Sequence, residues 1–205
     1  MIISLDSLIE KYNINIKGII HIGGHYGQEY DVYKMFKVPI VFFEPLSNNF
    51  YHLYHKIKND PNAKAFQCAL GNENKKILIN VETANNSQSS SILKPKKHLE
   101  LYPHITFDFT EEVSMFKLDD IELEEDKNYN FLNIDVQGYE LEVLKGASDF
   151  LKNVDYIMSE VNNEEMYENC AKVEELDNFL SPYNFQRIET NWVGGAWGDA
   201  FYIKK

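Results

Sequence analysis

Short apolar runs alternate with amphipathic segments along the first 70 residues. The runs at 18–22, 40–43 and 63–69 are mostly apolar, and 40–43 is apolar on both faces, which is typical of a strand at the centre of a parallel sheet. Residues 28–37 and 48–58 instead carry apolar side chains at helical spacing. This alternation predicts parallel strands joined by right-handed crossover helices, so the carboxyl ends of all three strands meet at one edge.

The same alternation returns in the C-terminal half, after a less regular middle part. We expect the following elements there: strand 131–135, helix 139–146, strand 154–161, helix 173–180, and strands 184–190 and 199–205 joined by a glycine-rich loop at 191–198. A short amphipathic helix at 4–12, within an N-terminal extension over 1–17, is predicted to precede the sheet.

The middle of the chain predicts two short added strands, at 75–82 and 112–117. Between them, residues 83–104 are rich in Asn, Ser and Pro and are predicted to form a long loop. Long loops in compact domains tend to cover binding sites, and we interpret this one as a lid, with a flexible insertion as the alternative. With no repeat or linker in view, residues 1–205 are predicted to form one domain.

Composition narrows the class of protein. A length of 205 residues with 44% hydrophobic residues suits one globular α/β domain. Acidic residues outnumber basic ones by 32 to 20, and this charge disfavours nucleic acid as a partner. The two cysteines, Cys68 and Cys170, form no disulfide framework and fit a reducing compartment. With no signal-peptide pattern and no apolar run near about 20 residues, we expect a soluble cytoplasmic protein that spans no membrane.

The first predicted strand ends in a glycine turn. Gly23 and Gly24 stop the apolar run, Gly27 follows, and helix-forming residues begin at Gln28. Glycine adopts backbone angles that other residues resist and lets backbone approach a ligand closely, near the N–H groups of a helix start. The turn is interpreted as a site for a nucleotide-like cofactor; the alternative is a connection that binds nothing.

An acidic residue at the next strand end sharpens this interpretation. Glu44 lies 21 residues after Gly23, where nucleotide-binding folds use an acid to accept hydrogen bonds from ribose hydroxyls. The dinucleotide pattern GxGxxG fails in both registers, because its second glycine falls on His25 or on Tyr26. The spacing from Gly23 to Gly27 matches the GxxxG turn of many methyltransferases and argues against a nicotinamide cofactor.

Three segments resemble FkbM-type methyltransferases, within the class I S-adenosylmethionine-dependent enzymes. They are Ile-Ile-His-Ile-Gly-Gly-His-Tyr-Gly (19–27), Val-Phe-Phe-Glu-Pro (41–45) and Asn-Ile-Asp-Val-Gln-Gly-Tyr-Glu-Leu-Glu-Val-Leu-Lys-Gly-Ala (133–147), and the resemblance spans about 18–204. Two positions depart from the pattern. His21 stands where class I enzymes usually carry an acid, and Gln137 replaces the usual glutamate of the third segment.

The resemblance implies a Rossmann-like, doubly wound seven-stranded α/β sheet of order 3-2-1-4-5-7-6, with the last strand antiparallel and helices on both faces. It also implies methyl transfer from S-adenosyl-L-methionine to a hydroxyl of a sugar, glycan or related small molecule, often in polysaccharide or natural-product pathways. We expect the cofactor to bind at the strand ends, at Gly23, Gly24, His25, Gly27, Gln28, Glu44, Pro45, Ala69, Leu70 and Asp135.

Two acids are the candidates for catalysis. Asp135 and Glu160 end neighbouring predicted strands, and either could accept the proton of a hydroxyl acceptor. Together they could hold a divalent cation through hard oxygen ligands, although the resemblance does not imply a metal. The alternatives are a cofactor contact for Asp135 and a buried structural carboxylate for Glu160.

Candidate acceptor contacts lie in the irregular and C-terminal parts. His104 reaches the site only if the loop folds over it, and His25 is a weaker catalytic candidate in the glycine turn. Trp192 and Trp197 could stack on a sugar ring, with Asp199 accepting hydroxyl hydrogen bonds. A surface role for the histidines and packing on the sheet for the tryptophans are the alternatives.

The functional hypothesis is therefore an O-methyltransferase with a small-molecule or glycan acceptor. The alternatives are N- or carboxyl-methylation of a small molecule, a nicotinamide-dependent oxidoreductase, and a domain that binds cofactor or partner proteins without catalysis. The sequence leaves the acceptor, the base, metal dependence and the oligomeric state open.

Overall fold

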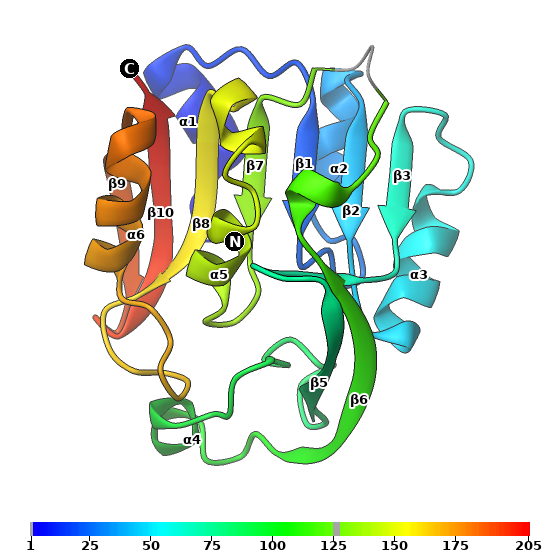
Figure 1. Cartoon of the computed structure of the whole chain (residues 1–205), viewed down its shortest axis with the longest axis vertical. Helices are drawn as coiled ribbons and strands as arrows, with labels where there is room; N and C mark the ends of the chain where they lie inside the picture. Colours follow the sequence, from blue (N-terminus) through cyan, green and yellow to red (C-terminus); the bar gives the residue numbers. More distant parts are fainter. Residues whose placement is uncertain (1, 125–127) are drawn as a thin grey trace.

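The computed structural model describes residues 2–124 and 128–205, and a seven-stranded sheet forms its centre (Figure 1). The strands lie in the order β3 (Ala63–Phe66), β2 (Ile40–Phe43), β1 (Ile19–Ile22), β7 (Phe131–Ile134), β8 (Tyr156–Asn162), β10 (Trp197–Lys204) and β9 (Phe185–Val193). The first five are parallel, and β10 runs antiparallel to both of its neighbours. The predicted Rossmann-like α/β fold and strand order are confirmed.

Helices cover both faces of this sheet, as the alternating pattern predicts. Every residue of β1, β2 and β7 is buried, because neighbouring side chains along each strand enter hydrophobic clusters on opposite faces. Ile20 and Ile22 pack with α5 (Glu140–Lys145) and α6 (Val173–Leu180). The opposite cluster contains residues of α1 (Leu5–Tyr12), α2 (Tyr30–Tyr33) and α3 (Ser47–Ile57).

The third predicted strand is divided between two sheets, so the prediction of one strand over 63–69 was wrong. Residues 63–66 form β3, whereas Ala69–Leu70 form β4 in a small sheet of order β4-β6-β5. In that sheet β5 (Lys75–Glu82) pairs with β6 (Phe107–Phe116), which is longer than the predicted strand at 112–117. A separate apolar cluster that includes Leu46, Ala69 and Met115 packs the small sheet against the start of α3.

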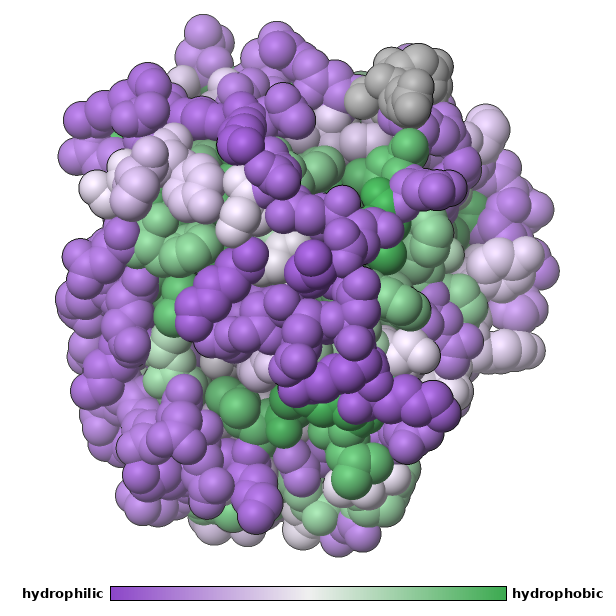
Figure 2. Space-filling view, viewed as in Figure 1, coloured by the Kyte–Doolittle hydropathy of each residue, from purple (hydrophilic) through white to green (hydrophobic). Residues whose placement is uncertain are grey.

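The segment 83–104 crosses the carboxyl edge of the main sheet. It is mostly irregular, as predicted, but contains one short helix, α4 (Lys97–Leu101), at the bottom of the view in Figure 1. Isolated bridges join Ser91 to Asn80 of β5 and Pro95 to Tyr167, and so tie the segment to the small sheet and to the residues that follow β8. Figure 2 shows a mostly hydrophilic surface, with hydrophobic side chains gathered in its lower half over the small sheet and the neighbouring loop.

The final hairpin is tighter than the sequence predicts. Strand β9 continues to Val193 and β10 begins at Trp197, so the turn is Gly194–Gly195–Ala196 rather than the loop 191–198. The strands consequently include three predicted acceptor residues: Trp192 on β9, and Trp197 and Asp199 on β10. Along each strand, side chains point alternately to the two faces of the sheet, and this fixes the direction of all three. Among the described helices, none has the length and apolar character needed to cross a membrane.

The glycine turn gives a stability prediction with a matched control. Gly23 has φ +86°, and a Cβ there would lie 1.8 Å from the carbonyl oxygen of Asp135. Gly194 also has positive φ, +57°, but a Cβ there would meet nothing within 4 Å. We expect Gly194→Ala to cost about 1–2 kcal/mol and Gly23→Ala about 1–3 kcal/mol more, because backbone at the turn must shift. Urea unfolding of both variants measures the difference; equal costs would contradict the close packing of the turn.

Candidate active site

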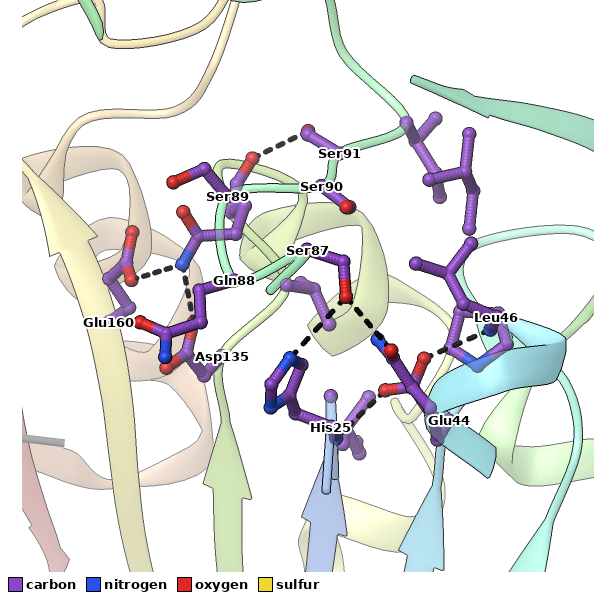
Figure 3. A pocket seen from close by; sticks show the side chains of 18 of the residues that line it. His25, Glu44, Leu46, Ser87, Gln88, Ser89, Ser90, Ser91, Asp135 and Glu160 are labelled. Carbon is purple, nitrogen blue, oxygen red and sulfur yellow. Dashed lines mark hydrogen bonds between the residues drawn. The ribbon is translucent and has the colours of Figure 1, made fainter. Parts of the chain in front are cut away.

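A cavity of about 690 Å³ lies at the carboxyl ends of β1, β2, β7 and β8. This is the edge where ligands bind in open α/β sheets, and the volume is that of a typical small-molecule site. Figure 3 shows the segment from Ser87 to Ser91 lying across the strand ends, with Asp135 and Glu160 on one side and His25 and Glu44 on the other.

The glycine turn forms one wall of the cavity. The N–H groups of Gly23 and Gly24 both donate to the carbonyl oxygen of Phe43, so the turn is fastened to the end of β2. Gly23 and His25 line the cavity, whereas Gly24 and Gly27 do not. Their missing Cβ atoms instead make room for Leu53 of α3, since a Cβ would lie 3.1 Å and 2.8 Å from its methyl carbons.

Glu44 lies buried at the end of β2 and lines the cavity next to this turn. Its two carboxylate oxygens accept the N–H groups of His25 at 2.8 Å and Leu46 at 2.9 Å. Burial raises the pKa of Glu44 to about 7, although these backbone N–H groups oppose the shift. Each oxygen has a second lone pair, so the carboxylate can still accept a hydrogen bond from a ligand hydroxyl.

Four other predicted cofactor positions also line the cavity: Gln28, Pro45, Ala69 and Leu70. Ala69 and Leu70 belong to β4, so the small sheet rather than β3 supplies this wall. With Leu46 and Ile79 they form an apolar surface beside Glu44. Such a surface suits the flat face of an aromatic ring.

Asp135 and Glu160 lie on the other side, and one amide connects them. The Nε2 atom of Gln137 donates to Asp135 Oδ1 and to Glu160 Oε2, both at 2.7 Å. The hydroxyl of Tyr167 donates to Gln137 Oε1 at 2.8 Å, which fixes the orientation of the amide. The sequence predicted that Asp135 and Glu160 would be close together, but not that Gln137 would lie between them.

Burial and mutual repulsion raise the pKa values of acids at this end of the cavity. Burial raises the pKa of Glu160 well above its usual range, and the nearby carboxylates of Asp135 and Glu140 raise it further. Burial likewise raises the pKa of Glu140 to about 7. Glu160 therefore holds its proton over a wider pH range than an exposed glutamate.

No group of three or more metal-ligating side chains is found among the described residues, and the Gln137 amide nitrogen between the acids is a donor, not a metal ligand.

Some of the predicted acceptor residues line the cavity, and one does not. His104, Trp197 and Asp199 line the cavity, whereas Trp192 packs against the core of the main sheet. Trp197 Nε1 donates to the hydroxyl of Tyr102 at 2.9 Å. Asp199 is buried and accepts the N–H groups of residues 2 and 3, so its carboxylate also fastens the start of the chain.

Several residues that line the cavity were not predicted from the sequence. His98 is buried on α4, where its Nε2 lies 3.0 Å from the Ser89 hydroxyl, and burial lowers its pKa. Tyr167 and Tyr102 also line the cavity. All of them lie in segments without periodicity; the serine-rich run at 89–91 was the one visible signal, and it was interpreted only as part of a loop.

The departure at His21 is explained by its surroundings. The ring is buried, which lowers its pKa, and the Tyr33 hydroxyl lies 3.3 Å from its Nδ1. The carboxylate of Glu29 lies 4.0 Å from the same nitrogen and lines the cavity. The following segment thus brings a carboxylate beside His21 in the cavity wall.

The raised pKa of Glu160 predicts how pH affects stability. Because the folded protein binds this proton more tightly than the unfolded chain, the stability contribution is full below about pH 4.5 and is lost as pH rises. Glu160→Gln cannot ionise, so its unfolding free energy should match the wild type near pH 4 and exceed it at pH 8 by on the order of 1 kcal/mol. Glu10→Gln, at an exposed site on α1, is the control. Parallel pH curves for all three proteins in urea would contradict the prediction.

Known proteins resemble this chain in sequence. Residues 21–187 match the model of the methyltransferase FkbM domain. A curated relative, 2-O-methyltransferase NoeI of Sinorhizobium fredii, is 29% identical over 111 residues, which are 51% of this chain and 46% of that protein. The match thus spans about half the length of the relative.

Solved structures show the same fold at low sequence identity. Magnesium protoporphyrin IX methyltransferase from Synechocystis, with bound S-adenosylmethionine, has a TM-score of 0.56 at 8% identity and covers 98% of this chain and 76% of its own. N-methyltransferase NodS from Bradyrhizobium japonicum, with bound S-adenosylhomocysteine, has a TM-score of 0.54 at 6% identity, covering 97% and 83%. The family predicted from the sequence is confirmed: the chain belongs to the FkbM methyltransferase family, and its fold is that of S-adenosylmethionine-dependent methyltransferases.

Proposed function

We propose that this methyltransferase transfers a methyl group from S-adenosylmethionine to a hydroxyl oxygen of a sugar or glycan. The observation that carries the proposal is the pair Asp135 and Glu160, held by Gln137 in the same cavity as the glycine turn and Glu44. A base beside a nucleotide-type site is the arrangement that methylation of a hydroxyl needs, and this pair of acids supports it.

The cofactor fits the side of the cavity formed by the ends of β1, β2 and β4. Glu44 is positioned to accept hydrogen bonds from ribose hydroxyls, and the apolar surface at Leu46, Ala69 and Leu70 suits the adenine ring. Glu29 supplies a carboxylate for the ammonium of the methionine part, in place of the acid replaced by His21. When bound, S-adenosylmethionine supplies an electrophilic methyl group.

The acceptor fits the side formed by the ends of β7, β8 and β10. Asp135 accepts the proton of the attacking hydroxyl, while Gln137 and Glu160 hold its carboxylate in position. Because burial and nearby acids make Glu160 retain its proton more readily, we assign the role of base to Asp135. Fixing the hydroxyl at attack distance contributes much of the acceleration.

One comparison and one feature of the cavity favour oxygen as the methylated atom. The relative NoeI carries the name 2-O-methyltransferase, and its matched region is 46% of its length. The aromatic side chains of Trp197 and Tyr102, connected by a hydrogen bond, lie on the acceptor side with carboxylates around them. Aromatic faces and carboxylates together suit the C–H and O–H groups of a sugar ring.

Cofactor binding is tested by thermal unfolding. S-adenosylhomocysteine at 100 times its dissociation constant should stabilise the protein by about 2.7 kcal/mol, a rise in Tm of about 5–10 °C, and NAD should give none. Glu44→Gln should reduce the shift at equal ligand concentration, because it loses a charged acceptor for the ribose. A shift with NAD, or no shift with the methyl donor and its product, would overturn the cofactor assignment.

Catalysis is tested by Asp135→Asn, which removes the base and keeps the shape of the side chain. We expect kcat to fall about 10²- to 10⁴-fold while the thermal shift with S-adenosylhomocysteine is retained. Asp6→Asn, at an exposed site on α1, is the control and should keep full activity. Methyl transfer by Asp135→Asn at the wild-type rate would remove Asp135 from the mechanism.

A further inference from the structure

We propose that the acceptor carries no phosphate: the enzyme methylates a sugar already linked as a glycoside or glycan, not a sugar phosphate or a nucleotide-activated sugar. This inference rests on the proposed function and specifies its acceptor. The cavity itself supports it through its charge, its backbone donors and its aromatic surface.

Acidic side chains predominate in the cavity wall. Among the described residues that line it are five carboxylates, Glu29, Glu44, Asp135, Glu160 and Asp199, and no lysine or arginine. A sugar phosphate carries about two negative charges at neutral pH and a nucleotide sugar a diphosphate, and proteins hold such groups with cations or with free backbone N–H groups. A phosphate in this cavity would face carboxylates without a cationic side chain.

Several pairs of backbone donors around the cavity are already used. Pairs of N–H groups that could cradle a phosphate instead donate to carboxylates of this chain. The pairs are His25 and Leu46 on Glu44, Ala84 and Asn85 on Glu82, Val136 and Gly138 on Glu140, and residues 2 and 3 on Asp199. The N-terminus of α3 is taken in the same way, because the N–H and hydroxyl of Ser47 donate to Glu111.

The histidines of the cavity do not replace the missing cations. Burial lowers the pKa of His21 and of His98, so both are neutral at neutral pH. His25 lies between the carbonyl oxygen of Asn86 and the amide of Gln28, an arrangement that a neutral ring satisfies with one donor and one acceptor nitrogen. This leaves the exposed His104 as the remaining imidazole.

Two lysines near the cavity are already paired with acids. Lys96 forms an ion pair with Glu165 at 2.5 Å, and Lys97 pairs with Glu164. These pairs join α4 and the residue before it to the segment after β8, and neither lysine lines the cavity. Lys96 and Lys97 therefore stabilise the segment 83–104, which covers the cavity, and are not available to a phosphate at the site.

The inference sets the order of reactions. An acceptor without phosphate must be supplied by a glycosyl transfer that has already released the nucleotide, or by removal of a phosphate group. Methylation then follows assembly of the glycoside rather than preceding it.

The test compares matched forms of the same sugars with the full chain and labelled S-adenosylmethionine. Each sugar is offered as its methyl glycoside, its 1-phosphate and its nucleoside diphosphate. We expect kcat/KM for the glycoside to be at least tenfold higher than for either phosphorylated form. Equal or better use of a phosphorylated form would overturn this inference and leave the proposed O-methylation standing.

Other outcomes separate the two proposals. If S-adenosylhomocysteine stabilises the protein but no form of any sugar is methylated, the sugar acceptor of the proposed function fails, and this inference fails with it. If the cofactor product gives no thermal shift, the cofactor assignment fails first.

A charge variant tests the physical cause. Gln88 lines the cavity with an exposed side chain near Asp135, whereas Gln186 is exposed on β9, outside the cavity. Gln88→Lys should raise the relative kcat/KM for the phosphorylated forms at least threefold, and Gln186→Lys should leave the ratio unchanged. The same ratio in both variants would mean that charge does not set the preference, and would overturn the argument.

Discussion

Carboxyl groups at one edge of a sheet, with no lysine or arginine among the described residues that line the same cavity, are the constraint on which this site depends. An ionised carboxylate in a low-dielectric cavity is costly unless donors surround it. This chain meets the constraint with N–H groups: backbone pairs hold Glu44 and Glu140, and a side-chain amide joins Asp135 to Glu160. Burial completes the arrangement by raising the pKa of Glu160, so that a proton replaces part of the missing positive charge.

The same hydrogen bonds order the segments around the cavity. Glu82 at the end of β5 accepts the N–H groups of Ala84 and Asn85, which starts the covering segment in a defined direction. The Ser87 hydroxyl donates to Asn49 on α3, and the Ser91 hydroxyl donates to the carbonyl oxygen of Gln137. The segment is thus attached at two points to elements that carry the site. A cavity closed by side-chain and backbone contacts of this kind excludes water from a charged reaction.

The sequence predicted the parts of the fold that local pattern determines. Uniformly apolar runs identified β1, β2 and β7, and Gly23 with Glu44 identified the cofactor edge, because both signals are carried by neighbouring residues. The division of 63–69 into β3 and β4 was not predictable in this way, since it depends on pairing with β6, more than 40 residues later. His98 and Tyr167 were missed for the same reason: their segments have no periodicity, and only tertiary contacts bring them to the cavity.

The departure at Gln137 is consistent with this electrostatic arrangement. A glutamate there would place a third carboxylate within hydrogen-bonding distance of two others, and like charges so close cannot all remain ionised. The amide instead supplies donors to both acids, and the Tyr167 hydroxyl on its oxygen prevents the reverse orientation. Since its amide donates to both acids, Gln137 adds no further negative charge beside Asp135 and Glu160. The glutamine is therefore compatible with a base at Asp135, and a carboxylate at position 137 is not required for that role.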